Sequence, residues 1–362
     1  MLTYDLSGRA EGPLYLRLYT LIKNDILSGT IPAGSRLPSK RTLAEHLGVS
    51  VITVDAAYKL LVDEGYADSR ERSGYFVREI APRMKREGSA TRLIPAVDPP
   101  AEPVSDMGFR YSALTRIMRE VITDYGERLM EKPPHLGCAE LRNAIAEYLL
   151  RYRGMVAQPD HIVIGSGSEY LYGMVVQLLG RERLYGIEDP SYEKIRKVYE
   201  AHGAACELLE LDRDGISSAA LAGTKADVLH VTPFHSFPTG ISAPASKRYE
   251  YLAWAEGGNR FIIEDDFDSE FSTNKKPQET LFSMDTAGRV IYLNTFSHSL
   301  APSMRMGYMI LPDGLMALYE EKLGFYSCSV PLFDQYVLAK FIARGYFERH
   351  LNRVRRRLKH EE

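Results

Sequence analysis

Apolar residues near the beginning of the chain recur at the spacing of an amphipathic helix. The pattern predicts a helix over residues 13–28, which begins at Pro13 and stops at Gly29. Its apolar positions are Leu14, Leu18, Leu21, Ile22 and Ile26. The Pro32-Ala-Gly-Ser35 stretch that follows predicts a turn of the chain.

Two shorter helices are predicted after this turn. Ser39 is the expected N-cap of a helix that runs through Leu47 and ends at Gly48. Ser50 caps the next helix, which ends at Gly65 and has an inward stripe of Val54, Ala57, Tyr58 and Leu61. Two helices joined by such a tight turn form a helix-turn-helix.

The alternating segments 66–68 and 74–77 predict a two-stranded wing behind the helix pair. In such a module the second helix enters the major groove of DNA with its N-terminus first. The residues expected to face bases and phosphates are Ser50, Val51, Ile52, Thr53 and Asp55. Asp55 fits poorly there because a carboxylate repels phosphate, and a helix pair with a hairpin also occurs in domains that bind no DNA.

Beyond the wing the pattern changes twice. Residues 78–106 are rich in proline and lack periodicity, which predicts a semi-extended linker between a domain of residues 1–77 and one of residues 107–362. The second domain alternates helical segments with short apolar strands, so it is expected to be an α/β domain with a mainly parallel sheet. The predicted strands are 162–164, 183–187, 228–231, 261–263 and 290–293.

Composition and charge narrow the class of protein. The 362 residues exceed what one core usually holds, and 45% hydrophobic with 26% charged residues is typical of a folded globular protein. The start of the chain resembles no secretion signal and no apolar run is long enough for a membrane helix, so a cytoplasmic location is expected. The three cysteines are too few and too widely spaced for a disulfide framework or a metal site.

The net charge of -3 does not by itself indicate a nucleic-acid-binding protein. Residues 1–77 are also balanced, with nine basic and nine acidic side chains. The basic residues Arg36, Lys40 and Arg41 nevertheless cluster around the start of one helix, and such a local group can hold phosphates although the sum is zero.

Three positions in the second domain have the chemistry of a ligand site. The Gly165-Ser-Gly-Ser168 loop joins a strand to a helix, where backbone N–H groups bind phosphate, although it is equally the pattern of a plain turn. Asp265 follows a strand and could pair with a protonated ring nitrogen or a metal, or simply cap a helix. Arg305 could clamp a phosphate or form a surface ion pair.

The long motif Leu37-Pro-Ser-Lys-Arg-Thr-Leu-Ala-Glu-His-Leu-Gly-Val-Ser50 continues into the wing segment Ser73-Gly-Tyr-Phe-Val77. Together they resemble the winged-helix domain of the GntR family of bacterial regulators. The resemblance implies that double-stranded DNA is contacted by Lys40, Arg41, Ser50, Thr53, Arg72 and Gly74. Many members have an arginine where Val51 stands, so the bases that are recognised are expected to differ.

Motifs along the second domain occur in a characteristic order: Pro134-His-Leu-Gly137, Gly165-Ser-Gly-Ser168, Glu188-Asp-Pro-Ser-Tyr192, Thr232-Pro-Phe-His-Ser-Phe-Pro-Thr-Gly240, Glu264-Asp-Asp-Phe267 and Thr295-Phe-Ser-His-Ser299. The whole chain thereby resembles the MocR-type branch of the GntR family, which fuses a winged helix to an aminotransferase-like domain of PLP fold-type I. For pyridoxal 5'-phosphate the resemblance implies that Asp265 pairs with the ring nitrogen, that Tyr192 stacks on the ring, and that Ser168, Thr295 and Arg305 hold the phosphate.

The sequence departs from the family pattern at several of these places. His298 stands at the position of the Schiff-base lysine, Phe267 replaces a tyrosine, and Glu169 stands in the phosphate loop where glutamine is common. Lys194 stands where some relatives have a substrate-binding arginine. The helix expected over residues 353–359 resembles the entry to a small C-terminal subdomain, and we expect the chain to be truncated before this subdomain.

These departures decide between two functions. Transamination uses the lysine twice, as the imine partner and as the base that moves the proton, and an imidazole cannot form the imine. We therefore expect a homodimeric transcriptional regulator that senses a PLP- or amino-acid-type effector without turnover, with the cofactor bound non-covalently or lost. The alternative is a PLP-dependent aminotransferase fused to a DNA-binding domain, in which His298 is an engineered replacement of the catalytic lysine.

Overall fold

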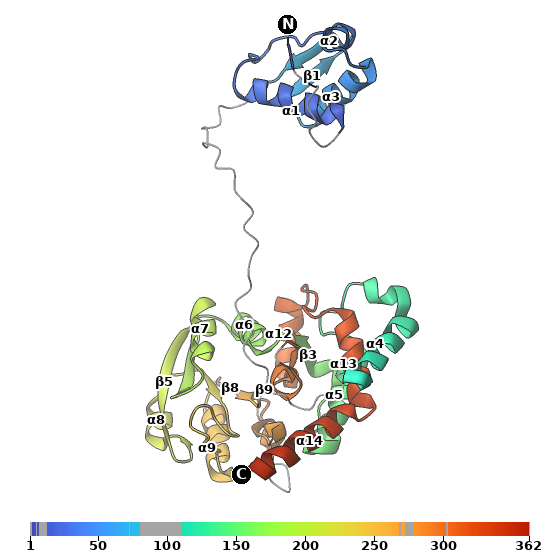
Figure 1. The fold of residues 1–362 in the computed structure, drawn as a ribbon. Helices are drawn as coiled ribbons and strands as arrows, with labels where there is room; N and C mark the ends of the chain where they lie inside the picture. Colours follow the sequence, from blue (N-terminus) through green and yellow to red (C-terminus); the bar gives the residue numbers. More distant parts are fainter. Residues whose placement is uncertain are drawn as a thin grey trace. The chain divides into compact units, whose positions relative to one another are not determined.

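The computed structural model describes residues 2–4, 6, 13–71, 73–79, 111–267, 269–271, 278–301 and 303–361. The chain divides into two compact units, Met1–Pro99 and Pro100–Glu362, each of which is described by itself (Figure 1). The residues predicted to form the linker lie outside the described residues from position 80 onward. No helix in the described ranges is long and apolar enough to span a membrane.

The smaller unit is a three-helix domain with a hairpin. Its elements are α1 (Leu14–Leu27), α2 (Lys40–Leu47), α3 (Val51–Asp63), β1 (Ala67–Arg70) and β2 (Gly74–Val77). Both predicted caps are present, because the Ser39 hydroxyl accepts from the Thr42 N–H and the Ser50 hydroxyl accepts from the Thr53 N–H. The side chains that join the helices into one core are fully buried: Leu18, Ile22, Leu43, Val54, Ala57, Tyr58 and Leu61.

The hairpin forms the predicted wing. β1 and β2 pair antiparallel from Ala67 opposite Val77 to Arg70 opposite Gly74. Gly74 has a φ of 106°, which favours glycine, and the Arg36 Nε lies 3.2 Å from the point that a Cβ of residue 74 would occupy. A larger residue would therefore be strained and would also press on this arginine.

The larger unit is built on a mixed sheet of the order β3-β10-β9-β8-β7-β4-β5-β6. Strands β4, β5, β7, β8 and β9 run parallel, and β10 is antiparallel to both of its neighbours. The strands are β3 (Ile162–Gly165), β4 (Leu184–Asp189), β5 (Ala205–Asp212), β6 (Gly215–Ile216), β7 (Val228–Val231), β8 (Phe261–Asp265), β9 (Val290–Thr295) and β10 (Gly307–Ile310).

Helices cover both faces of this sheet, so the domain has three layers. The α-helices are α4 (Tyr111–Tyr125), α5 (Ala139–Arg153), α6 (Ser168–Leu179), α7 (Glu193–Ala201), α8 (Ser218–Gly223), α9 (Ala245–Glu256), α10 (Leu281–Met284), α11 (Phe296–Ser299), α12 (Asp313–Leu323), α13 (Leu332–Ala343) and α14 (Tyr346–Glu361). Single 3-10 turns span Gly126–Met130, Pro159–His161 and Ser269–Phe271.

Alternate residues of the central strands point into different layers. Ile162 and Ile164 pack with α4, α5 and α13, which lie together in Figure 1, whereas Val163 packs with α6, α7 and α12. The strands are buried on both faces, as expected when helices cover a parallel sheet. This alternation decides which layer receives each polar side chain at the strand ends.

All five predicted strands are present, and three further strands complete the sheet. β5 was not predicted because it has one buried residue and lacks a continuous apolar run, and β6 was not predicted because it has only two residues. β10 is as short as β3 and β7, which were predicted, but it begins with Gly307, and a glycine weakens a strand signal. Glu264 and Asp265 belong to β8 itself and do not follow it.

Candidate functional site

The N-terminus of α3 presents apolar side chains to solvent. Ile52 is 80% exposed and Val51 is 44% exposed, although both stand at the start of a well-formed helix. A domain core does not use these side chains, and an apolar contact with thymine methyl groups would cover them. The described geometry therefore agrees with a helix that inserts into the major groove.

The Asp55 carboxylate is turned toward two lysine side chains. Its carboxylate oxygens lie 2.6 Å from Lys40 Nζ and 3.0 Å from Lys59 Nζ. These lysines lower the pKa of Asp55, with the hydrogen bond from Lys40 as the largest cause. The sequence analysis placed Asp55 toward the bases, whereas the structure makes it the group that holds Lys40 beside α3.

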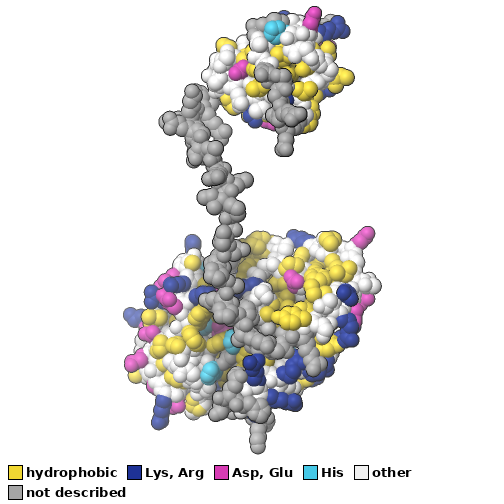
Figure 2. Space-filling model, in the orientation of Figure 1, with side chains coloured by type: hydrophobic (Ala, Val, Ile, Leu, Met, Phe, Trp, Pro, Cys, Tyr) yellow, Lys and Arg dark blue, Asp and Glu magenta, His cyan; other side chains and the backbone are white. Residues whose placement is uncertain are grey.

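The remaining predicted DNA contacts lie on the surface of this unit. Arg41 is exposed on the first turn of α2, and the hydroxyls of Ser50 and Thr53 lie 2.8 Å apart at the start of α3. Arg72 lies outside the described residues. The face of the small unit shown in Figure 2 carries scattered basic side chains among apolar ones, in line with its balanced charge.

In the larger unit, sheet topology gathers the predicted ligand residues at one edge. β3, β8 and β9 end at Gly165, Asp265 and Thr295, and parallel strands end on the same side. β10 runs the other way, and its first residue, Gly307, pairs with both Gly165 and Thr295. Arg305, two residues earlier, is thereby placed at the same edge.

Asp265 is buried at this edge with one oxygen unused. The Tyr172 hydroxyl donates to Oδ2, and His230 Nε2 lies 3.4 Å from the same oxygen. Oδ1 is buried and has no hydrogen-bond partner among the described residues. A buried carboxylate oxygen without a partner is costly, so this arrangement is suited to a ligand that brings a donor.

Tyr172 and His230 were not recognised from the sequence. Burial raises the pKa of Tyr172, and the neighbouring Ser168 hydroxyl at the start of α6 acts in the opposite direction. His230 Nδ1 lies 2.6 Å from the Tyr199 hydroxyl, and its other ring nitrogen, Nε2, is buried 3.4 Å from Asp265 Oδ2 and makes no hydrogen bond among the described residues. The available signal was a histidine within the otherwise apolar strand Val228–Val231.

The phosphate-loop end of the site is occupied by an internal ion pair. Glu169 Oε2 lies 3.0 Å from Arg305 Nη2, and Glu169 Oε1 lies 3.3 Å from Lys194 Nζ. Of the two alternatives for Arg305, the ion pair is what the structure contains. The residues involved are all at least one-third exposed, so the pair itself stabilises the fold little.

Thr295 and Tyr192 take other partners at the same edge. The Thr295 hydroxyl donates to the Met306 carbonyl and accepts from the Ser297 N–H, so it caps α11. Tyr192 is 41% exposed, with Lys194 Nζ 5.7 Å from its ring centroid. An exposed aromatic ring is available for stacking, whereas the Thr295 hydroxyl would have to give up Met306 to donate to a phosphate.

His298 lies on α11, directly after β9, in aromatic surroundings. Its ring centroid is 5.8 Å from that of Phe267 and 5.2 Å from that of Phe271, both in edge-to-face geometry. The two phenylalanines therefore surround His298 with apolar rings. The side chain is exposed, and no primary amine takes its place on this helix.

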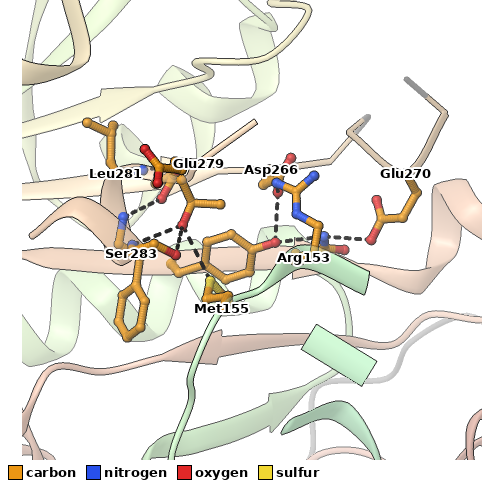
Figure 3. Close-up of polar contacts among 12 residues, drawn as sticks. Arg153, Met155, Asp266, Glu270, Glu279, Leu281 and Ser283 are labelled. Carbon is orange, nitrogen blue, oxygen red and sulfur yellow. Dashed lines mark hydrogen bonds and ion pairs between the residues drawn. The ribbon is translucent and has the colours of Figure 1, made fainter. Parts of the chain in front are cut away.

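A second polar cluster lies on the other face of the sheet. Arg153 Nη2 lies 2.6 Å from Asp266 Oδ2, which also accepts from the Tyr292 hydroxyl (Figure 3). Burial, with a further contribution from the Asp266 charge, raises the pKa of Glu270 to about 8. The cluster joins α5, β8 and β9, so Asp266 has a structural partner although it is the neighbour of Asp265.

Two more buried glutamates lie close to these strand ends. Burial raises the pKa of Glu188 to about 7 and that of Glu264 to about 8. Glu188 accepts from the Thr232 N–H and the Ser236 hydroxyl, and Glu264 accepts from the Leu281 and Phe282 N–H groups. Within the described ranges no group of His, Cys, Asp and Glu is arranged to hold a metal ion.

Family comparisons cover both units. Residues 14–77 match the family described as bacterial regulatory proteins, gntR family, and residues 109–361 match aminotransferase class I and II. The HTH-type transcriptional regulator YdeL of Bacillus subtilis (strain 168) is 35% identical over 360 residues, which cover 97% of this chain and 78% of that protein. The probable rhizopine catabolism regulatory protein MocR of Rhizobium meliloti is 30% identical, with 97% and 76% covered.

Another regulator and an enzyme of known structure are also similar to this chain. The HTH-type pyridoxine biosynthesis transcriptional regulator PdxR of Corynebacterium glutamicum is 28% identical, covering 94% of this chain and 75% of that protein. An archaeal alanine:glyoxylate aminotransferase superposes with a TM-score of 0.61 at 25% identity, covering 68% of this chain and 63% of the enzyme. The chain thus spans less than two thirds of that enzyme.

Proposed function

The chain belongs to the GntR family of bacterial regulatory proteins, in its MocR-type branch, and we propose that its aminotransferase-like domain senses a pyridoxal-type ligand without turning it over. Its close relatives are helix-turn-helix transcriptional regulators, which favours a DNA-binding regulator over an aminotransferase with a DNA-binding appendage. What we propose beyond the family is that the second domain binds its ligand and does not convert it.

One observation carries this proposal. The family resemblance places His298 at the position of the Schiff-base lysine. In the structure His298 lies beside Phe267 and Phe271, and the buried Oδ1 of Asp265 has no hydrogen-bond partner among the described residues. The group that would form the covalent bond is absent, but the group that would recognise the ring is kept. Such a site is suited to binding and not to transamination.

The residues present fit pyridoxal phosphate at its ring. Asp265 Oδ1 would accept from the protonated ring nitrogen, Tyr192 would stack on the ring, and Ser168, Thr295 and Arg305 would face the phosphate. When bound in an enzyme, this cofactor supplies an aldehyde and an electron sink. Here the chain's own residues would bind and orient the ring and exclude water from Asp265.

Replacing Asp265 by asparagine tests the ligand site. The amide keeps the shape but loses the charge, so the dissociation constant for pyridoxine 5'-phosphate should rise roughly tenfold or more. Equilibrium dialysis measures it, and this ligand has no aldehyde that could react with surface lysines. Asp313→Asn, whose carboxylate is 97% exposed, is the matched control. Equal affinity of wild type and D265N would contradict the proposed site.

A homodimer is part of the same proposal, because regulators of this kind usually bind symmetric sites. Ile117 and Val121 of α4 are fully buried, whereas the neighbouring stripe of Met118 and Ile122 is 36% and 57% exposed. An apolar stripe of this kind is available to a second chain. Light scattering should give twice the chain mass of 40.9 kDa at micromolar concentration, and the mass of one chain would argue against the dimer.

A further inference from the structure

Glu169 forms ion pairs with the two cations that a phosphate group of the ligand would contact. Each of its carboxylate oxygens faces a different cation, Arg305 at 3.0 Å and Lys194 at 3.3 Å. Burial acts to raise the pKa of Glu169, but the hydrogen bond from Lys194 and the charge of Arg305 outweigh it and lower the pKa. Glu169 is therefore a carboxylate at neutral pH.

The loop before α6 also has internal partners. The Ser166 N–H donates to the Ser329 hydroxyl at 3.1 Å, and the Gly167 N–H donates to the Gly165 carbonyl at 2.9 Å. The Arg305 guanidinium lies close over Gly167, with Nη2 3.5 Å from the point that a Cβ would occupy. Two of the amides that could cradle a phosphate are thus already used.

The charge balance follows from these contacts. Lys194 and Arg305 carry two positive charges, and Glu169 removes one, whereas a phosphate monoester brings close to two negative charges. The start of α6 favours an anion, but it already has one in the Glu169 carboxylate, which stands in its first turn. A second anion would have to displace this carboxylate or lie beside it.

The ring end of the site differs. Asp265 Oδ1 has no hydrogen-bond partner among the described residues, the Tyr172 hydroxyl donates to Oδ2, and His230 Nε2 lies 3.4 Å from Oδ2 without forming a hydrogen bond. We propose that this pocket recognises the pyridine ring and gains no affinity from the phosphate, so that it binds the unphosphorylated and the phosphorylated ring about equally, and that Glu169 is the residue that cancels a preference for phosphate. The proposal rests on the proposed function, because it assumes that Asp265 receives the ring.

Pyridoxine and pyridoxine 5'-phosphate test the proposal in equilibrium dialysis with the full chain. Wild type should bind the two within about threefold of each other. In Glu169→Gln the phosphate ester should bind about tenfold more tightly, since one like-charge contact is removed, while pyridoxine binding should stay unchanged. Glu200→Gln, which removes an exposed carboxylate of α7 that pairs with Arg196, is the matched control.

The possible results separate this inference from the function on which it rests. A strong preference of wild type for the phosphate ester, unchanged in E169Q, would overturn the role of Glu169 while leaving the ligand site in place. If wild type bound neither compound, the proposed function and this inference would both be overturned. If Glu200→Gln increased the affinity for the phosphate ester by the same factor, the role of Glu169 would also be overturned, because the increase would then come from the change in net charge.

Discussion

Replacing His298 by lysine is expected to give the chain a covalent, borohydride-reducible adduct with pyridoxal phosphate that wild type does not form at this position. A primary amine condenses with the aldehyde and releases water, whereas an imidazole has no primary amine. Phe267 and Phe271 flank the position, and their apolar rings would lower the pKa of the new amine and keep part of it unprotonated at neutral pH.

Peptide mass mapping after reduction measures this result. We expect nearly complete modification of residue 298 in the variant and none in wild type. His202→Lys places a lysine in an exposed position at the end of α7 and controls for reaction with surface amines. If the variant remained unmodified, or if wild type were already modified at Lys194, the idea of a retained pocket that has lost only its amine would be wrong.

Replacing Arg41 by alanine is expected to weaken binding to every DNA sequence by a similar factor. Arg41 is exposed at the start of α2, where a cation would contact phosphate and not bases. The slope of log affinity against log salt should fall by about one, as for the loss of one phosphate contact. Thr53→Val keeps the branched shape but removes a hydroxyl at the start of α3, so it should change the preferred sequence.

Fluorescence anisotropy of labelled duplexes over a range of salt concentrations distinguishes the two effects. Arg181→Ala changes the net charge equally but lies on the surface of the larger unit, so it should leave the slope unchanged. An Arg41→Ala protein with the wild-type slope would show that this arginine does not contact phosphate, and a Thr53→Val protein with unchanged preference would place base recognition elsewhere.

Local patterns in the sequence were sufficient to predict the helices of the winged-helix domain and the position of the strand that carries Asp265. Ser39 and Ser50 cap their helices as predicted, because N-cap preference depends on the residue itself and on the next turn. The apolar run of residues 261–263 located β8, although the strand continues through the buried Glu264 to Asp265. In these cases the determining contacts are close in sequence.

Contacts between distant segments could not be predicted. Tyr172 meets Asp265 across 93 positions, and Arg305 meets Glu169 across 136. Periodicity places each residue on a helix face or strand, but it does not say which polar groups of different elements meet. Asp55 shows the same limit over a shorter separation, because its pair with Lys40 depends on how α2 packs against α3, whereas its pair with Lys59 has the i,i+4 spacing of one helix.

The affinity of the full chain for DNA of its own upstream region, with and without ligand, tests the central claim most directly. Fluorescence anisotropy at low salt should show specific binding, and saturating pyridoxine or its phosphate should change the dissociation constant about fivefold or more, a typical size for coupling between two sites. The change should disappear in D265N. Failure to bind DNA at low salt, or an equal dissociation constant with and without ligand, would contradict a regulator that senses through its aminotransferase-like domain.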